Sequence, residues 1–305
     1  MERDDFWTVF QGSDTHERFC KEFLPDFYLT KNVPESVRKE WITTQSLLEH
    51  SYFNADFADV AVLYAVTVFE RALRIRYREL VGKDGGTLQK LSHWFFHNNY
   101  FETFNVEVID QMRSIRNGKA HAEKPPFAPS VFLMKIQPLI YLTNDLYEDV
   151  NLRNQRKDWL ETTQEEFKQH FHNGGILDDG EKRWIVDASV PMFWNNKSVD
   201  SRTFAFRPIF DLEPYRNDTH YTIQYKSFSL VKTEIDYANG SLHGVCKDSG
   251  RKISFKTAME EINQTRYEIW KKELAALDHN PVKHFGHYPL GKIYNVAWSE
   301  FLKTS

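Results

Sequence analysis

The residues best suited to chemistry lie in the ten-residue segment MRSIRNGKAH, which runs from Met112 to His121. Arg116 is followed directly by Asn117, and His121 comes five positions after the arginine. A histidine titrates near neutral pH, and proton transfer by such a group typically contributes about 10²–10⁴-fold to a rate. A guanidinium is always charged and binds phosphate oxygens through forked hydrogen bonds. The two residue types are therefore chemically suited to cleave a phosphodiester without a metal ion, although by themselves an arginine at a helix end and a histidine in a loop are common structural features.

The spacing of apolar residues predicts that this segment ends a helix. Val108, Met112 and Ile115 share one face of an amphipathic helix over about 105–117, and Gly118 is placed as its C-terminal cap. An arginine in the last turn of a helix is also favoured by the helix dipole alone. The position of the arginine therefore has an ordinary structural explanation as well as a chemical one.

Four further helices are expected in the same half of the chain, and a polar helix follows them. The helix over 55–80 is apolar on several faces, so we expect it at the centre of a bundle. The expected helices cover about 34–53, 55–80, 87–97, 130–150 and 153–172.

Over about 34–150 the chain resembles the HEPN superfamily, through Arg116-Asn117 and His121. Nucleases of that family carry an arginine and a histidine separated by four to six residues, the first of which is often polar, such as asparagine. No other arginine in the chain precedes a histidine at this spacing. The helix with Phe69-Glu70-Arg71 also looks like the second helix of the family's bundle, which often bears an acidic residue near the catalytic pair.

The resemblance implies a metal-independent endoribonuclease that uses the 2′-hydroxyl of RNA as its nucleophile. The implied catalytic residues are Arg116, Asn117, His121 and Glu70. The neighbouring cations expected to contact RNA are Arg74, Arg113 and Lys119. Glu70 and Arg74 are also spaced as an ordinary surface ion pair within one helix, and this explanation is equally open.

The resemblance also implies partners and a biological setting. Because one arginine and one histidine form a sparse active site, the family faces two motifs across the cleft of a two-fold homodimer. Such nucleases act in toxin–antitoxin or antiviral defence systems, so an antitoxin or an activating partner is expected. No cofactor is expected. His243, His279, His284 and His287 do not have the spacing of a zinc site, so no metal is expected either.

Two other classes of function stay open. One is a HEPN module without catalysis, which binds protein or nucleic acid and keeps its arginine and histidine for structural reasons. The other is a helical adaptor with a peptide-binding β domain.

Composition favours a globular protein of the cytoplasm. The 305 residues are 41% hydrophobic and 27% charged, which permits a packed core. Cys20 and Cys246 lie far apart and form no disulfide or metal motif, and the charged opening MERDDFW does not resemble a secretory signal. A net charge of −4 argues against a protein that coats nucleic acid, so RNA binding would need a local basic site. No membrane partner is expected.

The second half of the chain has the pattern of an α+β domain with an antiparallel sheet. Tyr221, Ile223 and Tyr225 alternate with polar residues as in a half-buried strand, and turn signals at Asn239-Gly240 and 248–250 indicate hairpins. We therefore expect a helical nuclease domain over 1–175 and a regulatory or binding domain over 176–305. The edge of its sheet could present itself to a partner.

Overall fold

The chain forms two compact units, residues 1–153 and 154–305. The computed structural model describes residues 2–9, 14–101, 103–120, 129–197, 200–216, 223–277, 282 and 287–304. The division falls in the first turn of a helix, α7, whereas the sequence placed it after residue 175. The greater part of α7 thus belongs to the second unit.

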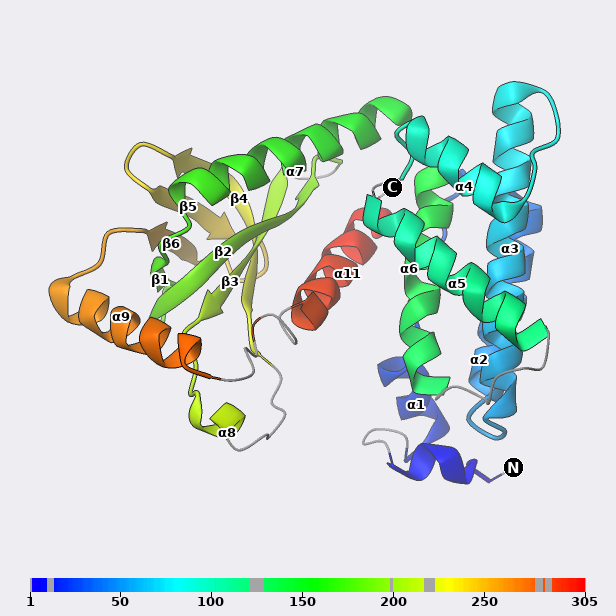
Figure 1. Cartoon of the computed structure of the whole chain (residues 1–305). Helices are drawn as coiled ribbons and strands as arrows, with labels where there is room; N and C mark the ends of the chain where they lie inside the picture. The colour runs from blue at the N-terminus through cyan, green and yellow to red at the C-terminus, as the bar shows by residue number, and fades with distance from the viewer. Residues whose placement is uncertain are drawn as a thin grey trace. The chain divides into compact units, whose positions relative to one another are not determined.

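The first unit is helical, as its apolar spacing predicted (Figure 1). Its elements are η1 (Asp5–Val9), α1 (His16–Glu22), α2 (Glu35–His50), α3 (Asp56–Val81), α4 (Leu88–His97), α5 (Thr103–Ala120), α6 (Pro129–Tyr147) and the start of α7 (Val150–His170). One predicted boundary is wrong, because α5 passes through Gly118 instead of ending there. A glycine inside a helix costs only about 1 kcal/mol relative to alanine, so it does not by itself end the helix.

Helix α3 is the central element of this unit, as expected. It contacts α2, α4, α5 and α6. Its buried residues lie on more than one face, and many are alanines, whose small side chains let neighbouring helices approach closely. Phe69 and Leu73 are fully buried and anchor the middle of α3 in the core. Glu70, which follows Phe69 in the helix, lies at the edge of that core.

The second unit contains a closed barrel of six antiparallel strands (Figure 1). Its elements are β1 (Gly175–Asp178), β2 (Arg183–Asn195), β3 (Ser201–Pro208), α8 (Glu213–Arg216), β4 (Lys226–Asp236), β5 (Ser241–Cys246), β6 (Lys252–Lys256), α9 (Glu261–Ala275) and α11 (His287–Lys303). Each strand pairs with the next along the chain, and β6 pairs with β1 through Leu177 and Phe255 to close the barrel.

Aromatic side chains fill the barrel. Phe204 of β3 and Phe255 of β6 are fully buried. Phe167 of α7 stacks on Phe204, and Phe171, which directly follows α7, stacks on Phe255, with ring centroids 5.7 and 5.6 Å apart respectively. Interiors of small barrels are filled by side chains in this way. These aromatic residues of the second unit thus form its core.

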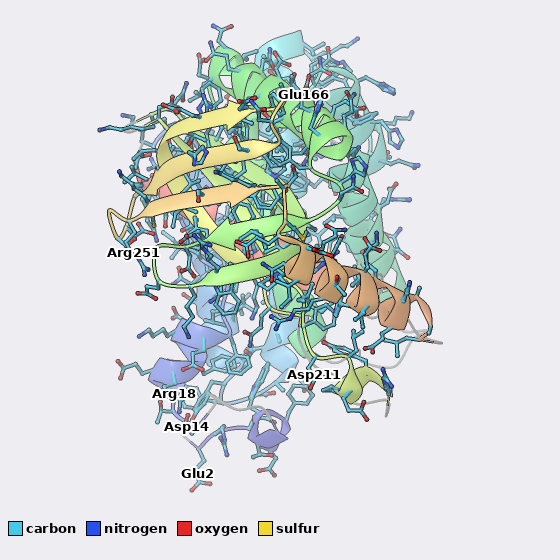
Figure 2. The ribbon with its side chains drawn as sticks, turned by 90° about the vertical axis from the view of Figure 1, so that its left-hand side faces the viewer. Glu2, Asp14, Arg18, Glu166, Asp211 and Arg251 are labelled. Carbon is cyan, nitrogen blue, oxygen red and sulfur yellow. The ribbon has the colours of Figure 1, made fainter. Side chains whose placement is uncertain are left out.

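Closure of the barrel corrects the expected open sheet. Within the described strands every strand has two neighbours, so this sheet offers no free edge for a partner strand. As predicted, a turn at 237–240 connects β4 to β5, and a turn at 247–249 connects β5 to β6. Arg251, which is labelled in Figure 2, follows the second of these turns.

The strand predicted over 221–226 is wrong. Residues 223–225 have no regular structure, β4 begins only at Lys226, and residues 221 and 222 lie outside the described part of the chain. Ile223 is buried, and the hydroxyl of Tyr225 accepts a hydrogen bond from Arg207. The alternation therefore reflects two separate tertiary contacts and not a pleated strand.

A buried ion pair joins β2 to β3. Asp187 lies at a bulge of β2, and its carboxylate accepts hydrogen bonds from Nε and Nη2 of Arg207 at 2.8 and 2.7 Å. The side chains are only 7% and 14% exposed, respectively. Burial raises the pKa of the Asp187 carboxyl, although Arg207 opposes this effect. The carboxylate therefore depends on its partner to stay charged in this position.

We expect Arg207→Ala to destabilise the barrel by about 3–5 kcal/mol, because it leaves a buried carboxylate without a partner. The matched control is Arg183→Ala, which removes the partner of Asp178 from a surface pair in which the arginine is 72% exposed. Such pairs contribute about 0–1 kcal/mol. Urea unfolding of both variants measures the difference, and equal losses would contradict the importance given to the buried pair.

Candidate functional site

The candidate site is built where α5 passes α3. Ile109 and Met112 are buried and hold α5 against the bundle, while Arg116 projects from the same helix one turn further on. On α3, Phe69 and Leu73 hold the helix in the core and leave Glu70 at its edge. Two helices that are separate in sequence thus bring opposite charges together.

Glu70 bridges two arginines. Its Oε2 accepts a hydrogen bond from Nη1 of Arg116 at 2.6 Å, and its Oε1 accepts one from Nη2 of Arg74, also at 2.6 Å. The Glu70 side chain is 16% exposed, whereas Arg116 and Arg74 are 33% and 42% exposed. We call these three residues the Glu70 cluster. With two guanidinium groups and one carboxylate, it carries a formal charge of +1 at the rim of the bundle.

The charges of the cluster determine the protonation of Glu70. Burial raises the pKa of its carboxyl, but the hydrogen bonds and positive charges of Arg74 and Arg116 outweigh burial and bring the pKa below its ordinary value. Glu70 is therefore a carboxylate at neutral pH. It can hold a guanidinium in place, but it is not poised to act as a general acid.

The arginines retain donors for a ligand. A guanidinium has five N–H donors, and Glu70 accepts a hydrogen bond from only one nitrogen of each arginine. Arg74 also lies near the carbonyl of Gly85, with Nη1 at 3.4 Å from that oxygen. Fixed guanidinium groups with remaining donors are suited to bind phosphate oxygens.

The other predicted site residues divide into three groups. Asn117 is exposed beside Arg116 on α5. Arg113 pairs with Asp110 one turn before it, with Nε and Oδ1 3.1 Å apart, so its charge is partly neutralised. Lys119 belongs to α5 but its side chain is not among those described, and His121 lies outside the described residues.

The remaining arginines of α3 do not form a basic patch. Arg71 pairs with Glu40 of α2, Arg76 pairs with Glu79, and Arg78 pairs with Asp84. Each positive charge has a carboxylate partner. Such pairs are typical of a solvated helix surface.

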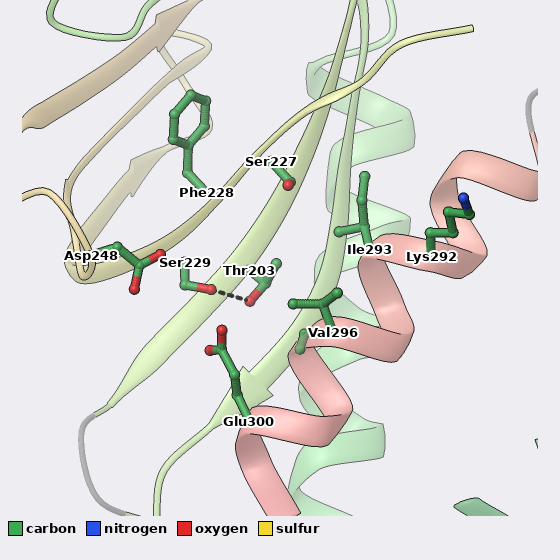
Figure 3. A pocket seen from close by; sticks show the side chains of 10 residues that line it. Thr203, Ser227, Phe228, Ser229, Asp248, Lys292, Ile293, Val296 and Glu300 are labelled. Carbon is green, nitrogen blue, oxygen red and sulfur yellow. Dashed lines mark hydrogen bonds between the residues drawn. The ribbon is translucent and has the colours of Figure 1, made fainter. Parts of the chain in front are cut away.

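Two features of the second unit have no recognisable signal in the sequence. One is the Asp187–Arg207 pair, whose members are 20 residues apart across a bulge. The other is a pocket of about 210 Å³ between α11 and the strands β3 and β4 (Figure 3). The hydroxyls of Thr203 and Ser229 lie 2.9 Å apart in its wall, and Glu300 of α11 points toward them. Hydroxyl groups on alternating strand positions are too common to predict a pocket.

The described ranges contain neither a metal-ligand cluster nor a membrane-spanning helix. No three histidine, cysteine, aspartate or glutamate residues gather there in a way that could hold a metal ion. None of the helices described there is both long enough and apolar enough to cross a bilayer.

No protein-family model, curated protein or solved structure matches this chain.

We expect Glu70→Gln to lower the free energy of unfolding by about 1–2 kcal/mol near neutral pH, because two charged hydrogen bonds weaken and two arginines lose their shared counter-charge. The matched control is Glu40→Gln, which leaves only Arg71 without its carboxylate and should have a smaller effect.

The effect of Glu70→Gln should depend on pH. Because the pKa of Glu70 is lowered in the folded state, its contribution is complete above the ordinary glutamate pKa of about 4.3 and is lost as the pH falls through the lowered value. Urea unfolding across acidic pH would show the wild type and the variant converging. A constant difference, or equal losses from the two variants, would contradict the bridging role.

Proposed function

We propose that the protein is a metal-independent endoribonuclease of the HEPN type, in which Arg116 and His121 carry out the reaction. The observation that supports this proposal is the Glu70 cluster. It places the arginine of the motif against an acidic residue of the central helix, 46 residues away in sequence. The family resemblance predicted this proximity from the two segments separately.

In the proposed reaction the 2′-hydroxyl of one nucleotide attacks the adjacent phosphorus atom. His121, which follows the last residue of α5 in the sequence, accepts the hydroxyl proton. The bond from phosphorus to the 5′-oxygen of the next nucleotide breaks, that oxygen takes a proton from water, and His121 afterwards returns its proton to the solvent. The products are a 2′,3′-cyclic phosphate and a 5′-hydroxyl. Arg116 stabilises the negative charge that develops on the phosphoryl oxygens.

The remaining members of the cluster support Arg116. Glu70 is a positioning residue, because its carboxylate holds the guanidinium by a 2.6 Å hydrogen bond and restricts its rotamers. Arg74 offsets the charge of Glu70, so the cluster stays attractive to a phosphate. Asn117 would hold one tautomer of His121 or bind a phosphate oxygen, while Arg113 and Lys119 would contact the flanking RNA.

We further propose that two chains share the reaction in a two-fold homodimer. Each chain supplies one Arg-Asn-x-x-x-His motif, and an isologous interface brings a second motif into the same cleft. The second unit would regulate the nuclease or bind an antitoxin or activator in toxin–antitoxin or antiviral defence. Its closed sheet disfavours strand addition as the mode of binding, so a partner would contact helices or loops.

We expect the protein to cleave RNA, but not DNA, in the presence of EDTA. His121→Ala should lower the rate by about 10²–10⁴-fold through loss of the base. Arg116→Ala should lower it by about 10²–10³-fold through loss of charge stabilisation. The control is Arg78→Ala, which removes another paired surface arginine of the same bundle and should leave the rate unchanged. Product ends are identified by mass spectrometry.

Each outcome separates the proposed enzyme from the alternatives. Wild-type cleavage by the His121→Ala variant would refute the assignment of the base. RNA binding without cleavage, weakened by Arg116→Ala but not by Arg78→Ala, would instead favour a non-catalytic HEPN module. An absence of both binding and cleavage would favour a helical adaptor.

We also expect two inactive variants to complement each other. If the cleft is composite, Arg116→Ala mixed with His121→Ala forms heterodimers that contain one intact arginine and one intact histidine. The mixture should regain part of the wild-type rate, and wild-type activity should fall when the protein is diluted below its dimer dissociation constant. Light scattering measures the oligomeric state. A fully active monomer would contradict the shared cleft.

A further inference from the structure

Helix α4 carries two exposed histidines on one face. His93 and His97 are four residues apart, and their ring centroids lie 6.4 Å apart. Residues at this spacing are neighbours on a helix surface, since 3.6 residues complete one turn. The same spacing of two histidines on one helix binds zinc in the HExxH motif, although α4 has no glutamate between them.

The helix that presents this pair is well anchored. Thr87 caps its N-terminus by accepting a hydrogen bond from the backbone N–H of Lys90. Leu88, Leu91 and Phe95 are buried on the opposite side and hold α4 against the bundle. The backbone positions of the two histidines are thus held by the core, and only their side-chain torsions need to adjust when a ligand binds.

The neighbouring polar side chains leave room for a cation. Lys90 lies three residues before His93, but its stem packs along Gly86, with Cδ 2.9 Å from the position that a glycine Cβ would occupy. The aliphatic part of this side chain therefore packs toward the start of α4, on the side of Gly86. The side-chain amide of Asn98 donates a hydrogen bond to the carbonyl of Trp94 at 2.8 Å and is occupied there.

We propose that His93 and His97 together bind one first-row divalent metal ion of the class that imidazole prefers, such as Zn²⁺. With Zn–N bonds of about 2.0–2.1 Å, two imidazoles at a tetrahedral angle hold their centroids roughly 5 Å apart. Rotation of the two exposed side chains about their torsions would shorten the distance between the ring centroids from 6.4 Å to this value. Water completes the coordination, because no third protein ligand gathers within the described ranges.

This site is independent of the proposed ribonuclease reaction. It lies on α4, whereas the Glu70 cluster joins α3 and α5. A Zn²⁺ ion bound by only two imidazoles keeps open positions that a donor from another molecule can fill. RNA cleavage in EDTA tests the nuclease, and metal binding tests this site, so either proposal can fail without the other.

The test is titration of the full chain with Zn²⁺ against a chromophoric chelator, with Mg²⁺ as the comparison ion. Wild-type protein should bind Zn²⁺ and not Mg²⁺ at this site. His93→Ala and His97→Ala should each remove one equivalent of bound Zn²⁺ or weaken it at least tenfold. The matched control Gln89→Ala removes another exposed polar side chain from α4 and should leave binding unchanged.

A further variant separates chelation from the mere number of histidines. Gln89→His combined with His93→Ala keeps two histidines on α4 but places them eight residues, or about 12 Å along the axis, apart. This separation is too large for one ion, so the same equivalent should be lost. Circular dichroism confirms that each variant is folded. Wild-type Zn²⁺ binding by His93→Ala and His97→Ala, or by the respaced variant, would overturn the proposal.

Discussion

The bridge made by Glu70 is the interaction on which the proposed site depends. A carboxylate that is 16% exposed at the edge of an apolar core is unfavourable unless its charge is compensated. Arg74 compensates one oxygen from the next turn of the same helix, and Arg116 compensates the other from α5. The bridge therefore ties two helices together and, at the same time, fixes the direction of the guanidinium proposed to bind phosphate.

The position of the bridge follows from the packing of α3. Because alanines such as Ala61, Ala65 and Ala72 are fully buried, α3 can be contacted by several helices at once. Glu70 lies at the margin of this buried surface, directly after Phe69. A helix with one apolar stripe would leave such a glutamate in solvent, where an ion pair contributes little. Packing on several faces partly buries Glu70, which by itself raises the pKa of its carboxyl, and it brings α5 close enough for Arg116 to join Arg74 in lowering that pKa.

The local parts of this arrangement can be predicted from sequence, and the long-range parts cannot. Periods of three and four residues locate α3 and α5, and the spacing of Glu70 and Arg74 predicts their pair. The contact of Glu70 with Arg116 could be expected only through a family resemblance, since no local rule relates residues 46 apart. His121 stays a prediction from sequence.

The barrel shows the same limit. Its turns near 239 and 249 are local and were predicted, whereas its closure depends on pairing between β1 and β6, whose partners, such as Leu177 and Phe255, are 78 residues apart (255 minus 177). Strand β2 is hidden from a pattern search, because bulges beside Asp187 and Met192 shift its alternation. The alternation of Tyr225 with polar neighbours led to the wrong prediction of a strand. The tyrosine instead makes a tertiary contact, in which its hydroxyl accepts a hydrogen bond from Arg207.

The distribution of charge limits how the protein can bind RNA. The chain has a net charge of −4, and most arginines of α3 are matched by carboxylates of α2, α3 or the following loop. Affinity for a polyanion therefore cannot come from a broad basic surface. The Glu70 cluster differs, since one carboxylate there serves two guanidinium groups. A two-fold dimer would place two such clusters near one cleft and double the local positive charge. Dimerisation would thereby supply the RNA-binding charge that a single acidic chain lacks, as well as the second copy of the catalytic motif.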